Sequence, residues 1–486
     1  MGTEVRSFRA HVLFAAGNAI GHRANWTRAS PDEPMSESGL GAHQTLEILR
    51  MGQAGDGVAR LADGRLAFVP GALPGELVDA AVTEERKNFV RARLIRRQRS
   101  AAERIEPICP LFSECGGCSF QHWDYQAELL YKESRVKEAL RRIAHHDPEI
   151  VGRIRGSQDP YGYRNKGQFP FGGSTGHAVL GLYRRGTHQV IPADHCDIQD
   201  PLINKVLAVG QSMANRLNVP PYDEAHDTGV LRHLLIRSSR REQQILVLLV
   251  VRQEHPALEP LADEIMRLVP EVQGIGVNIN PDRTNRILGP TTTLVRGQDT
   301  ITDVILGRSF RLSFTSFFQV NPTQVGVLYE TALGFLPPHT GEVWDLYSGV
   351  GTLAALAAGR ARFVRALEVN ADAVQDARQN FALNHIENVA IDAGRVEDLI
   401  AQWVREQKAP PDAVIVDPPR AGLNPEVIQQ LKDLRPGRII YVSCNPDTWA
   451  RDAESLTDSF QIAQAIPVDM FPRTDHVEVA SCLLRR

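Results

Sequence analysis

The sequence predicts an α/β protein: a doubly wound, mostly parallel sheet, preceded by an α+β region and an N-terminal β-barrel of the OB type. Three observations predict this. From about residue 342 onward, short apolar segments alternate with helical ones, as in a parallel sheet with crossover helices. From residue 44 to 99, short alternating segments are separated by glycine turns, as in a small barrel. The 486 residues accommodate about three domains at roughly 150 residues each.

Composition and charge narrow the class of protein. No segment approaches the ~18 consecutive apolar residues that a membrane-spanning helix needs, so no membrane partner is expected. The net charge of −4 argues against coating nucleic acid through bulk charge but leaves a local basic face open. Six cysteines are too few for a disulfide scaffold in a chain of this length. Residues 1–43 carry no strong period and are expected to be a disordered extension.

The predicted barrel, residues 44–101, ends in a basic strand. Its earlier strands are expected at Thr45–Arg50, Leu66–Val69 and Glu76–Val82. Between Arg86 and Arg99 there are seven Arg or Lys residues and no acid, with Phe89 among them. The segment is either a solvated charged strand or one that follows a nucleic-acid backbone, and its single sign of charge favours the second interpretation.

The central region, residues 102–312, holds a group of cysteines and a second basic zone. Cys109, Cys115 and Cys118 lie within ten residues, and Cys196 follows alone. A helix is expected over Tyr125–Ile143, followed by strands that include Leu231–Arg237 and Gln244–Val251. The basic zone combines aromatic and cationic side chains: Tyr161, Tyr163, Arg164, Lys166, Phe169, Phe171, Arg184 and Arg185.

The sheet region, residues 313–486, begins with a glycine turn. Its strands are expected at Val343–Leu346, Val364–Val369, Val389–Asp392, Ala413–Asp417 and Ile439–Ser443, and its helices include Ala371–Leu383 and Pro425–Leu434. After the first strand, Gly349 and Gly351 permit a tight turn into a helix and close approach of a ligand. Glu368 ends the next strand, where a carboxylate accepts hydrogen bonds from ribose hydroxyls. Because the third glycine of the dinucleotide fingerprint is missing, the pattern favours S-adenosylmethionine (SAM) over a dinucleotide.

Two further strand ends carry reactive side chains. Asp417 is followed by two prolines and Arg420, a stiff turn at the edge of the sheet where ligands bind. The next strand runs into Cys444, which is followed by Asn445 and Pro446. A cysteine at a strand end is often a small buried apolar residue. Beside a SAM pocket, the interpretation as a nucleophile is favoured.

These motifs together resemble the RNA uracil-5-methyltransferase family, whose members make 5-methyluridine in ribosomal or transfer RNA. The matching segments are DLYSGVGT at 345–352, DPPR at 417–420, SCNP at 443–446 and MFPRTDHVE at 470–478. The barrel resembles the TRAM RNA-binding domain, and the cysteine spacing resembles the iron–sulfur site of the ribosomal RNA branch. The resemblance covers about residues 44–486 and implies a Rossmann-like SAM-dependent methyltransferase domain.

The resemblance implies a role for each matching residue. Cys444 would be the nucleophile and Glu478 the base. The expected SAM contacts are Gln319, Tyr347, Glu368 and Asp417, with Thr352 as a lesser contact. The chemistry explains these choices, because carbon 5 of uracil is a poor nucleophile until a thiolate adds to carbon 6 and breaks the conjugation of the ring. The target base must also leave its stack to reach such a pocket.

The four cysteines Cys109, Cys115, Cys118 and Cys196 are expected to bind metal. Four thiolates bind either zinc or an iron–sulfur cluster. A spacing of five and then two residues, with one distant ligand, is unusual for a zinc ribbon and fits a [4Fe–4S] cluster better. Because SAM has its own sheet domain, a structural or RNA-facing role is expected for the cluster. Cys482 lies in an apolar run and is expected in the core.

The sequence therefore predicts a cytoplasmic, monomeric enzyme that methylates carbon 5 of a uridine in 23S ribosomal RNA, with no DNA partner. Transfer RNA is the nearest alternative substrate. Because family members that act on transfer RNA commonly lack the barrel and the cluster cysteines, ribosomal RNA is preferred. A rival from another class is a non-catalytic RNA-binding factor of ribosome assembly. The presence of Cys444, Glu478 and Asp417 argues against that rival.

Overall fold

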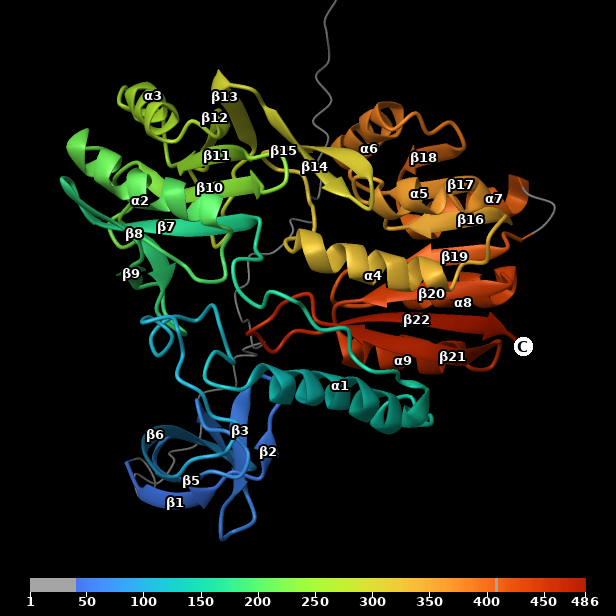
Figure 1. Ribbon diagram of the computed structural model, residues 1–486, viewed down its shortest axis with the longest axis horizontal. Coiled ribbons are helices and arrows are strands. Elements are labelled where there is room, and N and C mark those ends of the chain that lie inside the picture. The colour runs from blue at the N-terminus through green and yellow to red at the C-terminus, as the bar shows by residue number, and fades with distance from the viewer. Residues whose placement is uncertain (1–40, 407–409) are drawn as a thin grey trace, which may run out of the picture.

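A computed structural model describes residues 41–406 and 410–486, and Figure 1 shows its three parts. The N-terminal barrel lies at the bottom of the view, a sheet of the central region at the upper left and the sheet of the C-terminal region at the right. Most of the expected N-terminal extension, residues 1–40, lies outside the described residues. No helix in the described ranges is long and apolar enough to cross a membrane.

The barrel has six strands. They are β1 (His43–Glu47), β2 (Arg50–Met51), β3 (Asp56–Arg60), β4 (Leu66–Pro70), β5 (Leu77–Glu85) and β6 (Phe89–Arg99), in the order β1-β5-β6-β4-β3-β2. Successive side chains of a strand point to opposite faces. In β6, Val90 and Ala92 are therefore buried, whereas Arg91 and Arg93 are exposed. The basic residues of the last strand thus lie on the outer face of the barrel.

The central region is built on a seven-stranded sheet of order β13-β12-β11-β10-β7-β8-β9. Its strands are β7 (Lys166–Ser174), β8 (His177–Tyr183), β9 (Val190–Pro192), β10 (Leu231–Ser239), β11 (Gln244–Val251), β12 (Val272–Ile279) and β13 (Thr291–Gly297). Helices α2 (Pro201–Arg216) and α3 (Leu258–Leu268) cover it, and the hairpin of β14 (Thr300–Ile305) and β15 (Arg308–Ser313) leads on to the C-terminal region. Strands β10 and β11 confirm the predicted segments.

Helix α1 (Tyr125–Arg142) precedes this sheet in the chain but packs elsewhere. Asp124 caps its N-terminus by accepting hydrogen bonds from the backbone N–H groups of Gln126 and Ala127, which stabilises the first turn. Its buried face, with Val136 and Leu140, shares a hydrophobic core with the C-terminal sheet. In Figure 1, α1 accordingly runs alongside β21 and α9.

The C-terminal region is a doubly wound sheet of order β18-β17-β16-β19-β20-β22-β21. Its strands are β16 (Thr340–Leu346), β17 (Ala361–Glu368), β18 (Val389–Ala393), β19 (Ala413–Val416), β20 (Arg438–Ser443), β21 (Phe460–Val468) and β22 (Glu478–Arg485). Its helices are α4 (Pro322–Gly334), α5 (Thr352–Ala357), α6 (Ala371–Leu383), α7 (Val396–Glu406), α8 (Pro425–Leu434) and α9 (Pro446–Leu456). The strands up to β20 pair in parallel, and β22 pairs antiparallel with β20 and β21. The predicted Rossmann-like fold is confirmed.

The core of this sheet explains its continuous apolar strands. All four residues of β19 are buried, as expected of a parallel strand covered by helices on both faces. Alternate residues of β16 enter different cores: Val343 packs in the core that includes α4 and α5, and Trp344 in the core that includes α1 and α9. The two layers hold the carboxyl ends of the parallel strands at one common edge.

Candidate active site

The residues predicted from the motifs gather along this edge in the order of the strands. Glu368 ends β17, Tyr347 follows β16, Asp417 follows β19 and Cys444 follows β20. Glu478 begins β22, which runs antiparallel, and Ser443 pairs with Val479, so Glu478 also lies at this edge. Ligands of open α/β sheets bind at such an edge, where the chain crosses to opposite sides of the first strand.

The glycine turn after β16 has the conformation that its sequence predicts. Gly349 has a φ of +57° and Gly351 a φ of +79°. A Cβ atom on Gly351 would lie 2.7 Å from the ring of Phe381 in α6, so this position requires glycine on two grounds. The backbone N–H of Gly349 donates to Glu368 Oε2 at 2.9 Å, which ties the turn to the end of β17. Thr352 is buried at the first position of α5.

Gln319 lies in the segment before α4 and faces the same edge. Its side chain shares a hydrogen bond with Tyr329 of α4, and Tyr329 is acted on by the charges of Asp417, Asp345 and Glu478. Burial and these carboxylates raise the pKa of the Tyr329 phenol well above its usual value. Tyr329 therefore joins Gln319 to the carboxylates at the edge.

Two aspartates at this edge have raised pKa values, which favour their protonated forms. Burial, together with the charge of Asp345, raises the pKa of Asp417 from 3.8 to about 7. Burial also raises the pKa of Asp345 to about 7, although Ser348 Oγ donates to its Oδ2 at 2.5 Å and favours the ionised form. A backbone hydrogen bond from Ala354 also favours the ionised form. Tyr347, two residues after Asp345, has a φ of +67°. Burial raises the pKa of its phenol.

Cys444 sits on the turn that leads into α9. Asn445 caps the helix by accepting a hydrogen bond from the backbone N–H of Asp447 at 3.1 Å, and Pro446 occupies the first turn, where no N–H is needed. Asn445 Nδ2 also donates to the carbonyl oxygen of Arg420 at 3.3 Å. Burial and the charges of Glu478 and Asp417 raise the pKa of the Cys444 thiol to about 12. The asparagine–proline pair thus fixes the position of the thiol.

Glu478 is 4% exposed, and the charges of Asp417 and Arg420 act on its carboxyl. Burial, followed by the charge of Asp417, raises the pKa of its carboxyl from 4.5 to about 8. Arg420 opposes this shift, and it also lowers the pKa of Cys444. Arg420 is therefore the cation at this edge that favours the ionised forms of both reactive groups.

The sequence pointed to seven of these positions but assigned no role to Asp345, Tyr329 or Arg420. Asp345 begins the DLYSGVGT motif and Arg420 ends the DPPR motif, so their proximity to the site could have been inferred from the motifs. Tyr329 stands in an apolar helical pattern, where a tyrosine is normally read as core. Only the packing of α4 against the sheet brings it beside the carboxylates.

The four cysteines of the central region come together in space. All are free thiols; Cys115, Cys118 and Cys196 are buried and Cys109 is partly exposed. Burial raises the pKa of Cys118, and the charges of the other three cysteines act in the same direction. The backbone N–H of Gly117 donates to Cys115 Sγ at 3.3 Å. Within the part of the chain that the structure describes, no three His, Cys, Asp or Glu side chains are arranged to hold a single metal ion. Cys482, expected in the core, is buried in β22.

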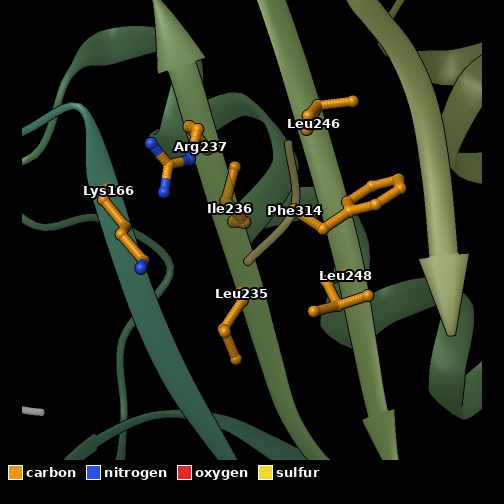
Figure 2. Close-up of a pocket in the computed structure, with 7 residues that line it drawn as sticks. All are labelled: Lys166, Leu235, Ile236, Arg237, Leu246, Leu248 and Phe314. Atoms are coloured by element: carbon orange, nitrogen blue, oxygen red, sulfur yellow. The ribbon is translucent and has the colours of Figure 1, made fainter. Parts of the chain in front are cut away.

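A small hollow lies in the central sheet, lined by residues of β7, β10 and β11 and by Phe314. Figure 2 shows Lys166 on β7 and Arg237 on the neighbouring β10, with the guanidinium extending toward β7. Burial and the charges of Arg237 and Arg164 lower the pKa of Lys166 to about 7. Arg237 donates to the carbonyl oxygen of Ser316, while its buried Nε has no hydrogen-bond partner within residues 41–406 and 410–486. Lys166, one member of the second basic zone, is thus withdrawn from solvent beside a second buried cation.

The basic strand of the barrel is more paired than its sequence suggests. Arg96 forms an ion pair with Asp79 at 2.9 Å, and Arg99 forms one with Glu47 at 2.9 Å. Phe89 packs edge-on against Phe68, with ring centroids 5.6 Å apart, and so belongs partly to the barrel core. Among the described residues, no side-chain partner is found for the exposed Arg93 and Arg97. These two are the strand's most available cations.

Comparisons with known proteins agree with the geometry. The model of the tRNA (uracil-5-)-methyltransferase family matches residues 124–486, and the model of the TRAM domain matches residues 37–95. An uncharacterized RNA methyltransferase of Caldanaerobacter subterraneus is 38% identical over 93% of this chain and 100% of its own length. A second, from Halalkalibacterium halodurans, is 37% identical over 88% of this chain and 94% of its own length.

A solved structure shares the fold. It is the tRNA (uracil-54, C5)-methyltransferase of Pyrococcus abyssi in complex with S-adenosyl-L-homocysteine, with a TM-score of 0.74 and 24% sequence identity. The alignment covers 91% of this chain and 100% of that one. The family model spans well over half of the chain, so the protein belongs to the RNA uracil-5-methyltransferase family and carries a TRAM domain at its N-terminal end.

Proposed function

We propose that this protein transfers a methyl group from SAM to carbon 5 of a uridine in 23S ribosomal RNA, through a covalent bond between Cys444 and the uracil. The observation that supports the proposal best is the convergence of Cys444, Glu478 and Asp417 at one edge of the sheet. The glycine turn and Glu368 lie at the same edge.

The chemistry of this edge fits SAM, which supplies an electrophilic methyl group on a positively charged sulfur. Asp345, Asp417 and Glu478 are three buried acids, whereas among the described residues Arg420 is the cation that lowers the pKa of Glu478 and Cys444. A site with more acids than bases suits a cationic ligand. Both oxygens of Glu368 already accept one backbone N–H bond, from Gly349 and Asn370, which leaves lone pairs for ribose hydroxyls. Gln319, Tyr347, Asp417 and Thr352 would complete the binding site.

The proposed reaction uses Cys444 first. Its sulfur bonds to carbon 6 of uracil, and the electron pair of the broken double bond makes carbon 5 enolate-like and able to take the methyl group. The thiol proton passes to water during this attack, because a group with a pKa of about 12 is not ionised at neutral pH, and the thiolate released at the end of the cycle takes a proton back. The charge of Arg420 and the N-terminus of α9 both favour the thiolate.

Glu478 acts last. Its carboxylate takes the proton from carbon 5, the electron pair restores the double bond, and the bond between carbon 6 and sulfur breaks. The enzyme is then regenerated and the RNA carries 5-methyluridine. A carboxyl with a pKa of about 8 is a stronger base than an exposed glutamate, which suits it to this proton.

RNA would be bound by the TRAM barrel and the central sheet. Arg93 and Arg97, exposed on the barrel, and the partly exposed Arg164 of the central region are cations that can contact phosphates. The barrel does not by itself select ribosomal RNA, since the transfer RNA enzyme of Pyrococcus abyssi aligns over 91% of this chain, a span too long to leave the barrel out. Transfer RNA is therefore the second candidate substrate, and experiment must distinguish the two.

A [4Fe–4S] cluster on Cys109, Cys115, Cys118 and Cys196 is part of the proposal. The four thiols are close enough for their charges to interact, and N–H groups already donate to two of the sulfurs. A cubane cluster is larger than one ion, so its ligands stand farther apart than the ligands of zinc. Brown protein with equal amounts of iron and acid-labile sulfide after anaerobic purification would support the cluster, and a colourless zinc protein would contradict it.

The main test uses purified protein, SAM and two unmodified RNAs, 23S ribosomal RNA and transfer RNA. We expect 5-methyluridine in the ribosomal RNA, none with Cys444→Ala, and an accumulated protein–RNA adduct with Glu478→Gln. Methylation of transfer RNA alone would exchange the substrate but keep the mechanism. Full activity of Cys444→Ala would refute the mechanism. Absence of methylation on both RNAs would instead favour the non-catalytic assembly factor.

A further inference from the structure

The loop 469–477 joins β21 to β22 and ends at Glu478. Val468 pairs with Glu478, so the loop leaves and re-enters the sheet at the active-site edge. The loop is largely buried: Asp469 is 0% exposed and Thr474 is 4% exposed. Arg473 has a φ of +68°, a conformation that a non-glycine residue keeps only where its surroundings hold it. The position of Glu478 therefore depends on what holds this loop.

The partners of the loop come from a distant part of the sequence. The carbonyl oxygen of Arg473 accepts hydrogen bonds from the backbone N–H groups of Ser119 at 2.8 Å and Phe120 at 3.0 Å. The backbone N–H of Arg473 donates to Glu128 Oε1 of α1 at 2.8 Å. In Figure 1, the loop between β21 and β22 accordingly lies above the first turns of α1. The loop is thus held by the segment that follows Cys118 and by α1.

Lys132 of α1 contacts the loop through the hydrogen bonds of its ammonium group. Its Nζ donates to Asp469 Oδ1 at 2.7 Å, to Glu128 Oε1 at 2.7 Å and to the carbonyl oxygen of Phe471 at 3.1 Å. These three bonds use all the donors of an ammonium group. The side chains of Lys132, Glu128 and Asp469 are all 0% exposed. One buried cation thus fixes two positions of the loop to the helix.

The charges around Lys132 balance only while it is present. Lys132 and Arg473 face the carboxylates of Glu128 and Asp469, and Arg473 Nη1 lies 3.5 Å from Glu128. Tyr125 donates a further hydrogen bond to Asp469 Oδ2 at 2.8 Å. Removing Lys132 would leave two buried carboxylates with one cation, an arrangement that forces the loop to move or to take up a proton.

The turn that carries Cys444 is held by other contacts. Asn445 bonds to the carbonyl oxygen of Arg420, and Thr448 Oγ1 donates to the same oxygen at 3.2 Å. No hydrogen bond of Lys132 reaches this turn among the described residues. Displacing the loop should therefore disturb the base more than the nucleophile.

We propose that Lys132 is a positioning residue for Glu478: it anchors the loop 469–477 so that the carboxylate reaches the proton on carbon 5. This inference rests on the proposed function. Without Lys132, Cys444 still bonds to carbon 6 and carbon 5 still takes the methyl group. The removal of the carbon 5 proton is slowed, so the bond between sulfur and carbon 6 persists.

The test compares two RNAs, one with uridine and one with 5-fluorouridine in place of uridine. Carbon 5 of 5-fluorouridine carries no proton to remove, so the methylated adduct is an end product, and its rate of formation reports only addition and methyl transfer. For Lys132→Met we expect adduct formation on the fluorinated RNA within about twofold of the wild type. Turnover of uridine RNA should fall at least about tenfold, with more adduct at steady state, as a displaced general base predicts.

The matched control is Lys137→Met. Lys137 lies on the same helix, but its side chain is 34% exposed and pairs with Glu133 of that helix at 2.9 Å. It should behave as the wild type with both RNAs. If Lys132→Met slows both RNAs equally, or neither, Lys132 does not position the base.

A charge-balanced variant guards against misfolding. If Lys132→Met does not fold, Lys132→Met with Asp469→Asn removes one buried charge of each sign and is tested in the same way. The wild type separates the two proposals, because it must trap the fluorinated RNA if Cys444 is the nucleophile. A wild type that traps none would overturn the proposed function, and the role of Lys132 with it. A trapping wild type with equal slowing of both RNAs by the variant overturns only the role of Lys132.

Discussion

Replacing Glu478 with glutamine should change how the stability of the ligand-free protein depends on pH. Folding raises the pKa of Glu478 from 4.5 to about 8. Between those values the folded protein keeps a proton that the unfolded chain has lost, so unfolding releases a proton and the free energy of unfolding falls as the pH rises. The stability linked to this proton is complete below pH 4.5 and is lost as the pH rises through about 8.

The size of the effect follows from the same two pKa values. Each pKa unit corresponds to about 1.4 kcal/mol, so raising the pH from 5 to 8 removes about 3 kcal/mol of stability through this one carboxyl. Asp345 and Asp417, whose pKa values are raised to about 7, act in the same direction but are present in both proteins. Between pH 5 and pH 8, the free energy of unfolding of Glu478→Gln should therefore rise by about 3 kcal/mol relative to that of the wild type.

Urea unfolding at pH 5, 6, 7 and 8 measures this difference. Glu454→Gln, a change at an exposed glutamate of α9, is the control and should show no widening. The absolute offset between Glu478→Gln and the wild type is unimportant, because a buried amide brings its own cost. A difference that stays constant or narrows with pH would refute the raised pKa of Glu478, and with it the explanation of its strength as a base.

Three other predictions address the cofactor, the RNA and the cysteines. Gly351→Ala should lower the free energy of unfolding by about 1–3 kcal/mol and weaken SAM binding in calorimetry, because its Cβ would meet Phe381 at a φ of +79°; wild-type SAM affinity would contradict it. Arg93→Gln and Arg97→Gln should each reduce the slope of log K for RNA against log salt by about 1 with Tm unchanged; an unaltered slope would place the RNA elsewhere. Cys196→Ser should lose iron and sulfide but still bind SAM, and full iron content would remove Cys196 from the cluster.

The strand ends of the active site could be predicted because their signals are local. The period of apolar residues locates β16, β19 and β20 within a few residues. In a doubly wound sheet, the residues after such strands must share one edge, so the motifs at Asp417 and Cys444 could be brought together without coordinates. In the structure, the asparagine–proline pair at 445–446 caps and begins α9.

The contacts that hold the loop 469–477 could not be predicted, because they join residues far apart in the sequence. The apolar period of α1 shows which face is buried but not what covers it. Lys132 looks in the sequence like a solvated helix lysine, yet its ammonium contacts Asp469, 337 positions later. The ion pairs of the barrel's basic strand could not be predicted for the same reason, since Asp79 and Glu47, which pair with Arg96 and Arg99, come from other strands.

The raised pKa values at the edge lead us to expect that a bound cation changes the protonation of Asp417 and Glu478. In the free protein, Cys444 with a pKa of about 12 and Glu478 with a pKa of about 8 are both mainly protonated at pH 7. A positive charge beside Asp417 and Glu478 would favour their ionised forms. We therefore expect protons to be released when SAM binds and fewer when the neutral product S-adenosyl-L-homocysteine binds. Calorimetry in two buffers of different ionisation enthalpy counts these protons. Equal release with both ligands would show that the charge on sulfur does not control the ionisation of this edge.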